Sequence, residues 1–331
     1  MDAPPTTTAI DLAALYSLRD KYIRTDRDDL FRSHLDRLLK RGADDRLLPE
    51  PVTFTATGET RGIALVEGAG GGKTSLVHHA LSTHPALQSE DPLRVPWIGV
   101  RVPSPATLKS LGLEILRQSG YPQASASLRE WDIWGRVRDR FANLGTRLLW
   151  IDEAHDLFRA GKPDAVENIL KVLKSLMQGE HAVIVVLTGV DMLWQMASYD
   201  DQVKRRYSKV TLPAVSTATH GPLFRGVMET FCEKLGLAPP VEADLVERLL
   251  HASRYRFGRC LENILAALEI AVLERAPRLG MAHFAEAFSM QEGCTAGRNV
   301  FLTPNWAQID LAAPGPESPA KTSQPKSRKK R

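Results

Sequence analysis

The 331-residue chain has few of the features that mark disulfide-bonded, secreted or membrane-spanning proteins. Its three cysteines lie far apart without a CxxC pair, which argues against a disulfide framework or a zinc site and suits a reducing compartment. No apolar run approaches the roughly 20 residues that span a bilayer, and the N-terminus lacks a basic segment followed by an apolar core. We therefore expect a cytoplasmic protein with no membrane partner.

A broad excess of positive charge is also missing from most of the chain. The net charge is +4, but residues 312–331 contain six basic residues and only one acidic residue, Glu317. The remainder is therefore not a broadly basic nucleic-acid binder by charge count, although one face could still be basic. The Pro-, Ser- and Lys-rich tail is predicted to be disordered. It could contact DNA or a protein partner, or it could simply be solvated.

The middle of the chain alternates short apolar segments with segments of helical periodicity. Strands are expected at 62–66, 96–102, 148–152, 182–188 and 208–215, and helices at 73–82, 107–120, 131–144 and 164–179. Strands separated by helices indicate an α/β fold, with a parallel sheet covered by helices on both faces. Helical spacing of apolar residues is also found at 18–42, and it dominates from about Pro222 to about Ser289.

The segment VEGAGGGKTSL, residues 66–76, contains most of a phosphate-binding loop. The pattern G-x-x-x-x-G-K-[ST] ends here in Gly72, Lys73 and Thr74. Glycines let backbone N–H groups turn toward phosphate oxygens, the lysine reaches the β and γ phosphates, and the threonine hydroxyl ligates Mg²⁺. We predict that ATP is bound by Gly68, Ala69, Gly70, Gly71, Gly72, Lys73, Thr74 and Ser75.

Glu67 stands where this pattern begins with glycine. A carboxylate directed at the phosphates would repel them, so we expect its side chain to point away, toward a basic neighbour. The alternative is a glycine-rich turn that binds no nucleotide.

The segment LLWIDEAHDLF, residues 148–158, supports the nucleotide site. An apolar strand ends in Asp152, which would hold Mg²⁺ together with Thr74, and Glu153, which would polarise the attacking water. The letters DEAH also occur in helicases, but no second helicase-like core follows residue 220. His155 is therefore interpreted as a helix-start residue that orients the acidic pair or packs against a neighbour.

Three later positions are candidates for contacts with the nucleotide. Thr188 ends the fourth expected strand and could sense the γ phosphate, or it could only terminate the strand. Arg206, next to Arg205, could reach the nucleotide of a neighbouring subunit and stabilise transition-state charge; alternatively, the two arginines form a solvated patch or a DNA contact. Arg259 begins a helix in the second half and could fold back onto the phosphates, or it could be a capping or surface residue.

With these residues in place, the chain resembles an AAA+ ATPase, and more narrowly the TniB and TnsC-like ATPases of bacterial transposition. The resemblance spans about residues 15–310. It rests on KYIRTDRDDLFRSHLDRLL, LLWIDEAHDLF, RRY before the fifth strand, and RNVFLTPNWAQIDL near the end. The chain departs from the family pattern at Glu67, at Val300 in place of Pro, and at Val190 in place of Thr.

The resemblance implies an ATP- and Mg²⁺-dependent P-loop ATPase with four regions. These are an N-terminal helical element at 1–58, the AAA+ core at 59–218, a small helical lid with a C-terminal segment at 219–311, and the tail at 312–331. It further implies a homo-oligomer that assembles on double-stranded target DNA with little sequence preference. Its protein partners would be an integrase-type transposase and a target-selection protein. Competing hypotheses are a nucleotide-gated adaptor that binds only proteins, and an AAA+ loader similar to replication initiators.

Overall fold

The computed structural model describes residues 12–56, 58–121, 127–159, 163–197 and 201–312, which form two compact units. The described residues within Tyr22–Ala214 form one unit, and those within Val215–Arg331 and Met1–Lys21 form the other. The division into four regions expected from the sequence stays a prediction. Of the predicted tail at 312–331, all but the first residue lies outside the described residues. Within the described ranges, no helix has the length and apolar character to cross a membrane.

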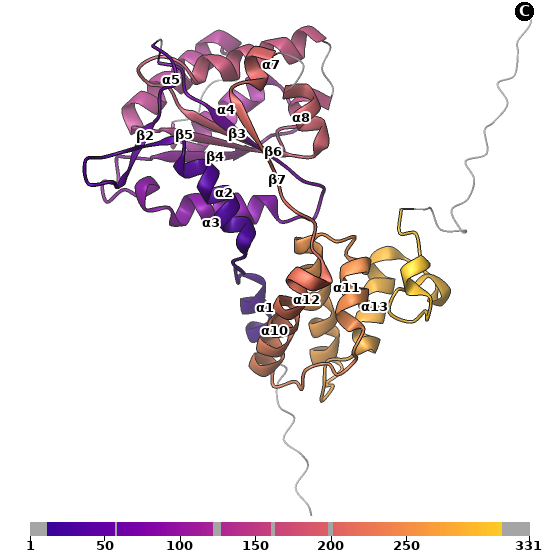
Figure 1. Cartoon of the computed structure of the whole chain (residues 1–331). Helices are drawn as coiled ribbons and strands as arrows, with labels where there is room; N and C mark the ends of the chain where they lie inside the picture. Colours follow the sequence, from indigo (N-terminus) through magenta and orange to yellow (C-terminus); the bar gives the residue numbers. More distant parts are fainter. Residues whose placement is uncertain (1–11, 57, 122–126, 160–162, 198–200, 313–331) are drawn as a thin grey trace, which may run out of the picture. The chain divides into compact units, whose positions relative to one another are not determined.

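The first unit is built on a five-stranded parallel sheet with the strand order β4–β5–β6–β3–β7 (Figure 1). Its strands are β3 (Gly62–Val66), β4 (Trp97–Arg101), β5 (Leu148–Asp152), β6 (Ile184–Gly189) and β7 (Tyr207–Thr211). All five confirm the sequence prediction, because short apolar segments suit strands that are buried on both faces. The parallel arrangement brings the carboxyl ends of all five strands to one edge.

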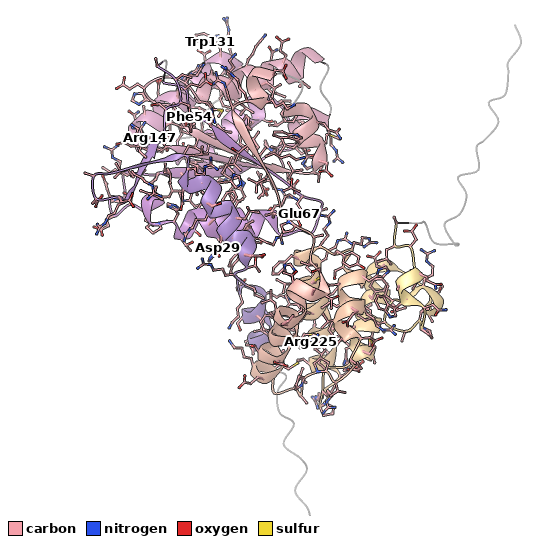
Figure 2. The ribbon with its side chains drawn as sticks, viewed as in Figure 1. Asp29, Phe54, Glu67, Trp131, Arg147 and Arg225 are labelled. Atoms are coloured by element: carbon pink, nitrogen blue, oxygen red, sulfur yellow. The ribbon has the colours of Figure 1, made fainter. Side chains whose placement is uncertain are left out.

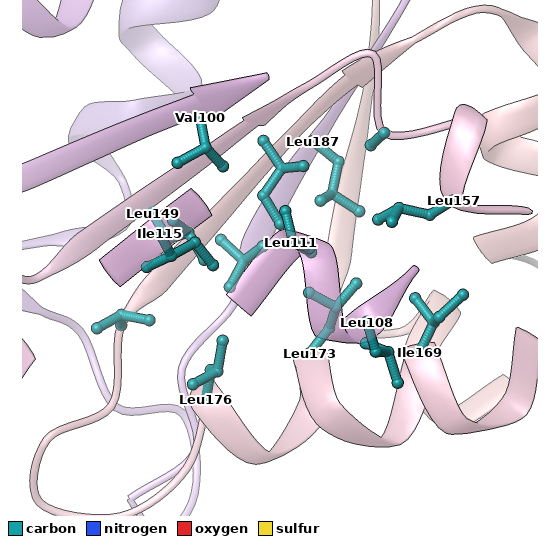
Figure 3. Packing of buried hydrophobic residues seen from close by; sticks show 14 of the residues in the cluster. Val100, Leu108, Leu111, Ile115, Leu149, Leu157, Ile169, Leu173, Leu176 and Leu187 are labelled. Carbon is teal, nitrogen blue, oxygen red and sulfur yellow. The ribbon is translucent and has the colours of Figure 1, made fainter. Parts of the chain in front are cut away.

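Helices cover both faces of this sheet, as predicted (Figure 1). Alternate strand residues point to opposite layers: Leu149 and Ile151 pack into the cluster shown in Figure 3, whereas Leu148 and Trp150 pack on the other side. The first layer contains α4 (Leu108–Gln118), α5 (Glu130–Leu144), α6 (Asp156–Arg159) and α7 (Pro163–Leu176), and the second contains α2 (Asp26–Asp36) and α3 (Lys73–Thr83). Two short helices, α8 (Asp191–Ala197) and α9 (Asp201–Lys204), precede β7.

The sequence prediction missed a small β-hairpin that follows α2. Strands β1 (Leu39–Arg41) and β2 (Leu47–Pro51) pair antiparallel, in a stretch where helical spacing had been expected to run to residue 42. The turn between them closes through a hydrogen bond from the Gly42 N–H to the Arg46 carbonyl oxygen (2.8 Å), and Asp45 adopts a left-handed φ of 62°. Aspartate tolerates this conformation better than most residues, so Asp45 suits the turn.

The second unit is helical in its described part, in agreement with the periodicity after Pro222. It contains α10 (Thr217–Leu235), α11 (Leu245–Ala252), α12 (Phe257–Leu273) and α13 (Met281–Glu292), together with α1 (Leu12–Arg19), which packs on α10 and α12. Cys232 and Cys260 are buried here, and burial raises the pKa of their thiols to about 11 and about 12. All three cysteines are free, as expected from their spacing.

Candidate functional site

The glycine-rich loop joins β3 to α3, in the strand–loop–helix arrangement that phosphate binding requires. Gly70 and Gly72 have φ values of 76° and 89°, in the left-handed region where glycine lacks the steric penalty of a Cβ. Gly72 is the N-cap of α3. The backbone N–H groups of the first turn of α3, together with the positive end of the helix dipole, make this a suitable place for an anion.

Lys73 folds back into the loop that precedes it. Its side chain is buried, and Nζ donates hydrogen bonds to the carbonyl oxygens of Glu67 (2.9 Å) and Gly68 (3.3 Å). The ammonium group is therefore held within the loop, next to the backbone N–H groups that bind phosphates in a site of this kind. Thr74 and Ser75 follow on the exposed first turn of α3.

Three polar side chains predicted from distant motifs meet at the carboxyl edge of the sheet. The Thr74 hydroxyl donates to Oδ2 of Asp152 (2.9 Å), and the Thr188 hydroxyl donates to Oδ1 of the same carboxylate (2.6 Å). Asp152 and Thr188 are both buried. Sequence reasoning missed Trp150, whose indole Nε1 donates to the Thr188 hydroxyl (3.1 Å) and thereby fixes its orientation. The Asp152 carboxylate is thus positioned through both oxygens.

Glu153 continues from Asp152 into a strained turn. Its φ is 53°, and such a conformation costs a non-glycine residue about 1–3 kcal/mol and is concentrated at functional sites. The buried His155 lies between two acids, with Nδ1 3.3 Å from Oε2 of Glu153 and Nε2 3.5 Å from Oδ1 of Asp156. The side chain of Glu153 is 26% exposed and so remains accessible to water. The contact between His155 and Glu153 does not meet the geometry of a hydrogen bond, so the orienting role expected of His155 stays a prediction.

Glu67 points to a basic neighbour, as predicted, and that neighbour is Arg27 of α2. Glu67, labelled in Figure 2, follows directly on β3, and its Oε2 accepts a hydrogen bond from Nη2 of Arg27 at 2.6 Å. Nη1 of Arg27 donates to the Gly71 carbonyl oxygen at 2.9 Å. Sequence reasoning missed Arg27, because a pair separated by 40 residues leaves no local signal in the chain.

The structure places Arg206 differently from the role predicted for it. Its guanidinium is 2% exposed and donates through Nη2 to Oε2 of Glu59 at 2.8 Å, whereas an arginine that reaches a neighbouring subunit must be exposed. The solvated member of this pair is Arg205, with 63% of its side chain exposed and Nη2 3.6 Å from the same carboxylate oxygen. The trans contact predicted for Arg206 is therefore not available in this conformation.

Arg259 lies near the start of α12, in the second unit. Its Nη1 is 3.8 Å from Oε1 of Glu292, which also accepts from Arg254 at 2.7 Å. The hydrogen bond from Arg254 is the main cause that holds the pKa of Glu292 below its usual value, and the charge of Arg259 adds to it. An approach of Arg259 to the phosphates would join the two units and stays a prediction.

A protein-family comparison matches residues 19–217, more than half of the chain, to the family described as bacterial TniB protein. No relative was found among curated proteins.

Solved structures with the same fold include the ORC1 protein of Aeropyrum pernix in complex with DNA (18% identity, TM-score 0.61, covering 86% of this chain and 70% of that chain). They also include the ORC2 protein of the same organism in ADPNP–ADP complexes (17%, 0.55, 85% and 75%) and Drosophila ORC bound to DNA (15%, 0.55, 90% and 70%). At these identities the likeness establishes the fold alone, and that fold is the predicted AAA+ P-loop sheet followed by a helical unit.

Proposed function

Because the chain belongs to the TniB family, we propose that it is an ATPase that regulates DNA transposition. In this proposal, ATP binds to the loop between β3 and α3, and the ATP-bound protein assembles on double-stranded DNA and recruits an integrase-type transposase. Hydrolysis then releases the assembly. The observation that carries the proposal is the convergence of Thr74 and Thr188 on the Asp152 carboxylate, next to Lys73 in the loop.

The residues at this edge supply what phosphoryl transfer to water requires. Lys73 would exchange its bonds to loop carbonyls for the β and γ phosphates, because a lysine in this position neutralises phosphate charge. Glu153 would accept a proton from the attacking water, and His155, whose Nδ1 lies 3.3 Å from Oε2 of Glu153, would orient the carboxylate. Thr188, held by Trp150, would respond to the γ phosphate through the carboxylate that it shares with Thr74.

Mg²⁺ fits the donor set offered by Thr74 and Asp152. Hydroxyl and carboxylate oxygens are the ligands this cation prefers, and the two side chains already lie within hydrogen-bond distance of each other. When bound, Mg²⁺ would neutralise charge on the β and γ phosphates.

The proposed assembly is a homo-oligomer that responds to the bound nucleotide. A cation that contacts the nucleotide of a neighbouring subunit makes association depend on the γ phosphate, and the exposed Arg205 suits this role better than the buried Arg206. DNA would be held through its phosphates, so binding should tolerate different sequences and weaken with salt. The names of the fold relatives also support a DNA partner, since the ORC1 protein of Aeropyrum pernix and Drosophila ORC are described in complex with DNA.

Two variants test the ATPase part of the proposal. Lys73→Ala should lose ATP binding, whereas Glu153→Gln should retain binding and lose most hydrolysis, because the carboxamide cannot accept the proton. The measurements are binding of a labelled ATP analogue and release of phosphate. Wild-type binding by Lys73→Ala, or wild-type turnover by Glu153→Gln, would contradict the roles proposed for these residues.

A further inference from the structure

A buried ion pair lies against the phosphate-binding loop. Arg27 and Glu67 have side-chain exposures of 4% and 2%, and Nη2 of the arginine lies 2.6 Å from Oε2 of the carboxylate. The same guanidinium donates to the carbonyl oxygen of Gly71 through Nη1. One side chain from α2 therefore holds both the first residue of the loop and a residue four positions later.

The carboxylate of Glu67 packs closely against the loop at Gly71. A Cβ built on Gly71 would lie 2.0 Å from both Cδ and Oε2 of Glu67, a separation that no side chain can adopt without displacing the carboxylate. The loop at Gly71 is thus packed against the Glu67 carboxylate. Its conformation depends on where that carboxylate is held, and Arg27 holds it.

Helix α2 is itself fixed on α3, the helix that follows the loop. Just before α2 begins, the Tyr22 ring stacks on His79 of α3, with ring centroids 3.7 Å apart. At the end of α2, Oδ1 of Asp36 lies 2.9 Å from Nε2 of His84, just after α3. Arg27 therefore belongs to a helix that is attached near both of its ends to α3, the helix that follows the loop.

Hydrogen bonds at the start of α2 also restrict the position of Arg27. Thr25 is the N-cap and forms a capping box with Asp28, and the Thr25 hydroxyl accepts a hydrogen bond from the Arg27 N–H. The Tyr22 hydroxyl donates to Asp28 as well. Capping of this kind fixes the first turn of a helix and so limits the freedom of the arginine that the first turn carries.

We propose that Arg27 is a positioning residue for ATP: it cancels the charge of Glu67 and holds the loop in the shape that accepts a triphosphate. This inference rests on the proposed function and explains how the loop can work without its leading glycine. Loss of Arg27 alone would leave a carboxylate at the loop without its cation, and a negative charge there repels phosphates. Loss of Glu67 alone would leave a cation, which attracts them.

The test compares Arg27→Gln, Glu67→Gln and the double variant in the full chain. Affinity is measured by calorimetry with a non-hydrolysable ATP analogue and with ADP. We expect Arg27→Gln to weaken binding of the ATP analogue by roughly tenfold or more, by analogy with the loss of a side chain that orients a metal ligand. ADP binding should weaken less, because ADP carries less charge. The double variant should recover much of the loss, since it removes both charges.

Arg206→Gln serves as the matched control, because it breaks a second buried arginine–glutamate pair in the same unit, on Glu59 instead of Glu67. It should melt at lower temperature but bind the ATP analogue as the wild type does. A purely structural role for Arg27 predicts the same behaviour for Arg27→Gln.

The outcomes separate the two proposals. If the wild type binds the analogue and Lys73→Ala does not, but Arg27→Gln binds normally, the positioning role is wrong and the proposed function stands. Equal weakening of ATP analogue and ADP by Arg27→Gln, without recovery in the double variant, would likewise overturn it. If the wild type binds neither nucleotide, both proposals fail together.

Discussion

Two buried arginine–glutamate pairs lie at opposite ends of strand β3 and show how the same interaction serves different purposes. Glu67 follows the strand and pairs with Arg27, whereas Glu59 precedes it and pairs with Arg206. Both pairs are almost fully buried and similarly short, at 2.6 and 2.8 Å. They differ in what surrounds them: the first lies against the phosphate-binding loop, and the second lies where strands begin.

The surroundings of the two pairs predict their roles better than the types of their residues do. From the sequence, Arg206 is the candidate for a catalytic contact, because it precedes the fifth strand, and Arg27 is an inconspicuous helix residue. In the structure, Arg206 joins Glu59 and the backbone near Lys174 inside the unit, and Arg27 contacts the loop directly. Because ligands of such folds bind at the carboxyl edge of the sheet, we expect the Arg27–Glu67 pair, and not the Arg206–Glu59 pair, to affect nucleotide binding.

The largest expected effect comes from breaking the pair far from the loop. Arg206→Gln removes the buried cation of Glu59 and leaves only the exposed Arg205, 3.6 Å from the carboxylate. Removal of one partner of a buried pair costs about 3–5 kcal/mol of stability. Urea unfolding should show this loss as a lower midpoint with an unchanged slope. An unchanged free energy of unfolding would mean that the Arg206–Glu59 pair does not stabilise the first unit.

A smaller effect is expected from crowding the pair at the loop. Gly71→Ala places a methyl group against the Glu67 carboxylate, and overpacking of this kind costs about 1–3 kcal/mol. Affinity for the ATP analogue should fall as well, because the loop has to change shape.

Gly135→Ala is the control for this substitution. Gly135 lies within α5, where an added Cβ would meet no atom within 4 Å, and alanine should stabilise the helix by roughly 0.5–1 kcal/mol relative to glycine. If Gly71→Ala also raised stability and kept full affinity, the carboxylate would not be packed against the loop.

The last prediction tests the Thr188 hydroxyl at the same edge. Thr188→Val keeps the shape of the side chain but removes the hydroxyl that joins Trp150 to Asp152, and a hydrogen bond to a charged group contributes about 1.5–3 kcal/mol. ATP hydrolysis should fall while binding of the analogue persists, which steady-state kinetics and calorimetry can separate. Wild-type hydrolysis would return Thr188 to the simpler role of ending a strand.

Much of the fold could be predicted from the sequence, because its signals are local. The apolar segments that became β3 and β5 are short and bounded by glycine or acidic residues, and the loop after β3 carries its own motif. The residues brought to Asp152, namely Thr74 and Thr188, were also predictable, since each lies at or beyond the carboxyl end of a strand of a parallel sheet.

What could not be predicted depends on contacts between distant parts of the chain. Arg27 and Glu67 are 40 residues apart, and Glu59 and Arg206 are 147 residues apart, so neither pair has a sequence signature. The hairpin after α2 was missed because Leu38 and Leu39 continue the apolar spacing of the helix, although the helix ends at Asp36. In each case tertiary contacts, rather than local preference, decided the outcome.

The central claim, that bound ATP drives assembly on DNA, is tested most directly by sedimentation of the full chain with duplex DNA. Parallel samples contain ATP, a non-hydrolysable analogue or ADP, and Lys73→Ala is the control. The account predicts large DNA-containing assemblies with ATP and the analogue, and their loss with ADP and in the variant. Nucleotide binding by a protein that never enters a complex with DNA would contradict it and favour a nucleotide-gated adaptor.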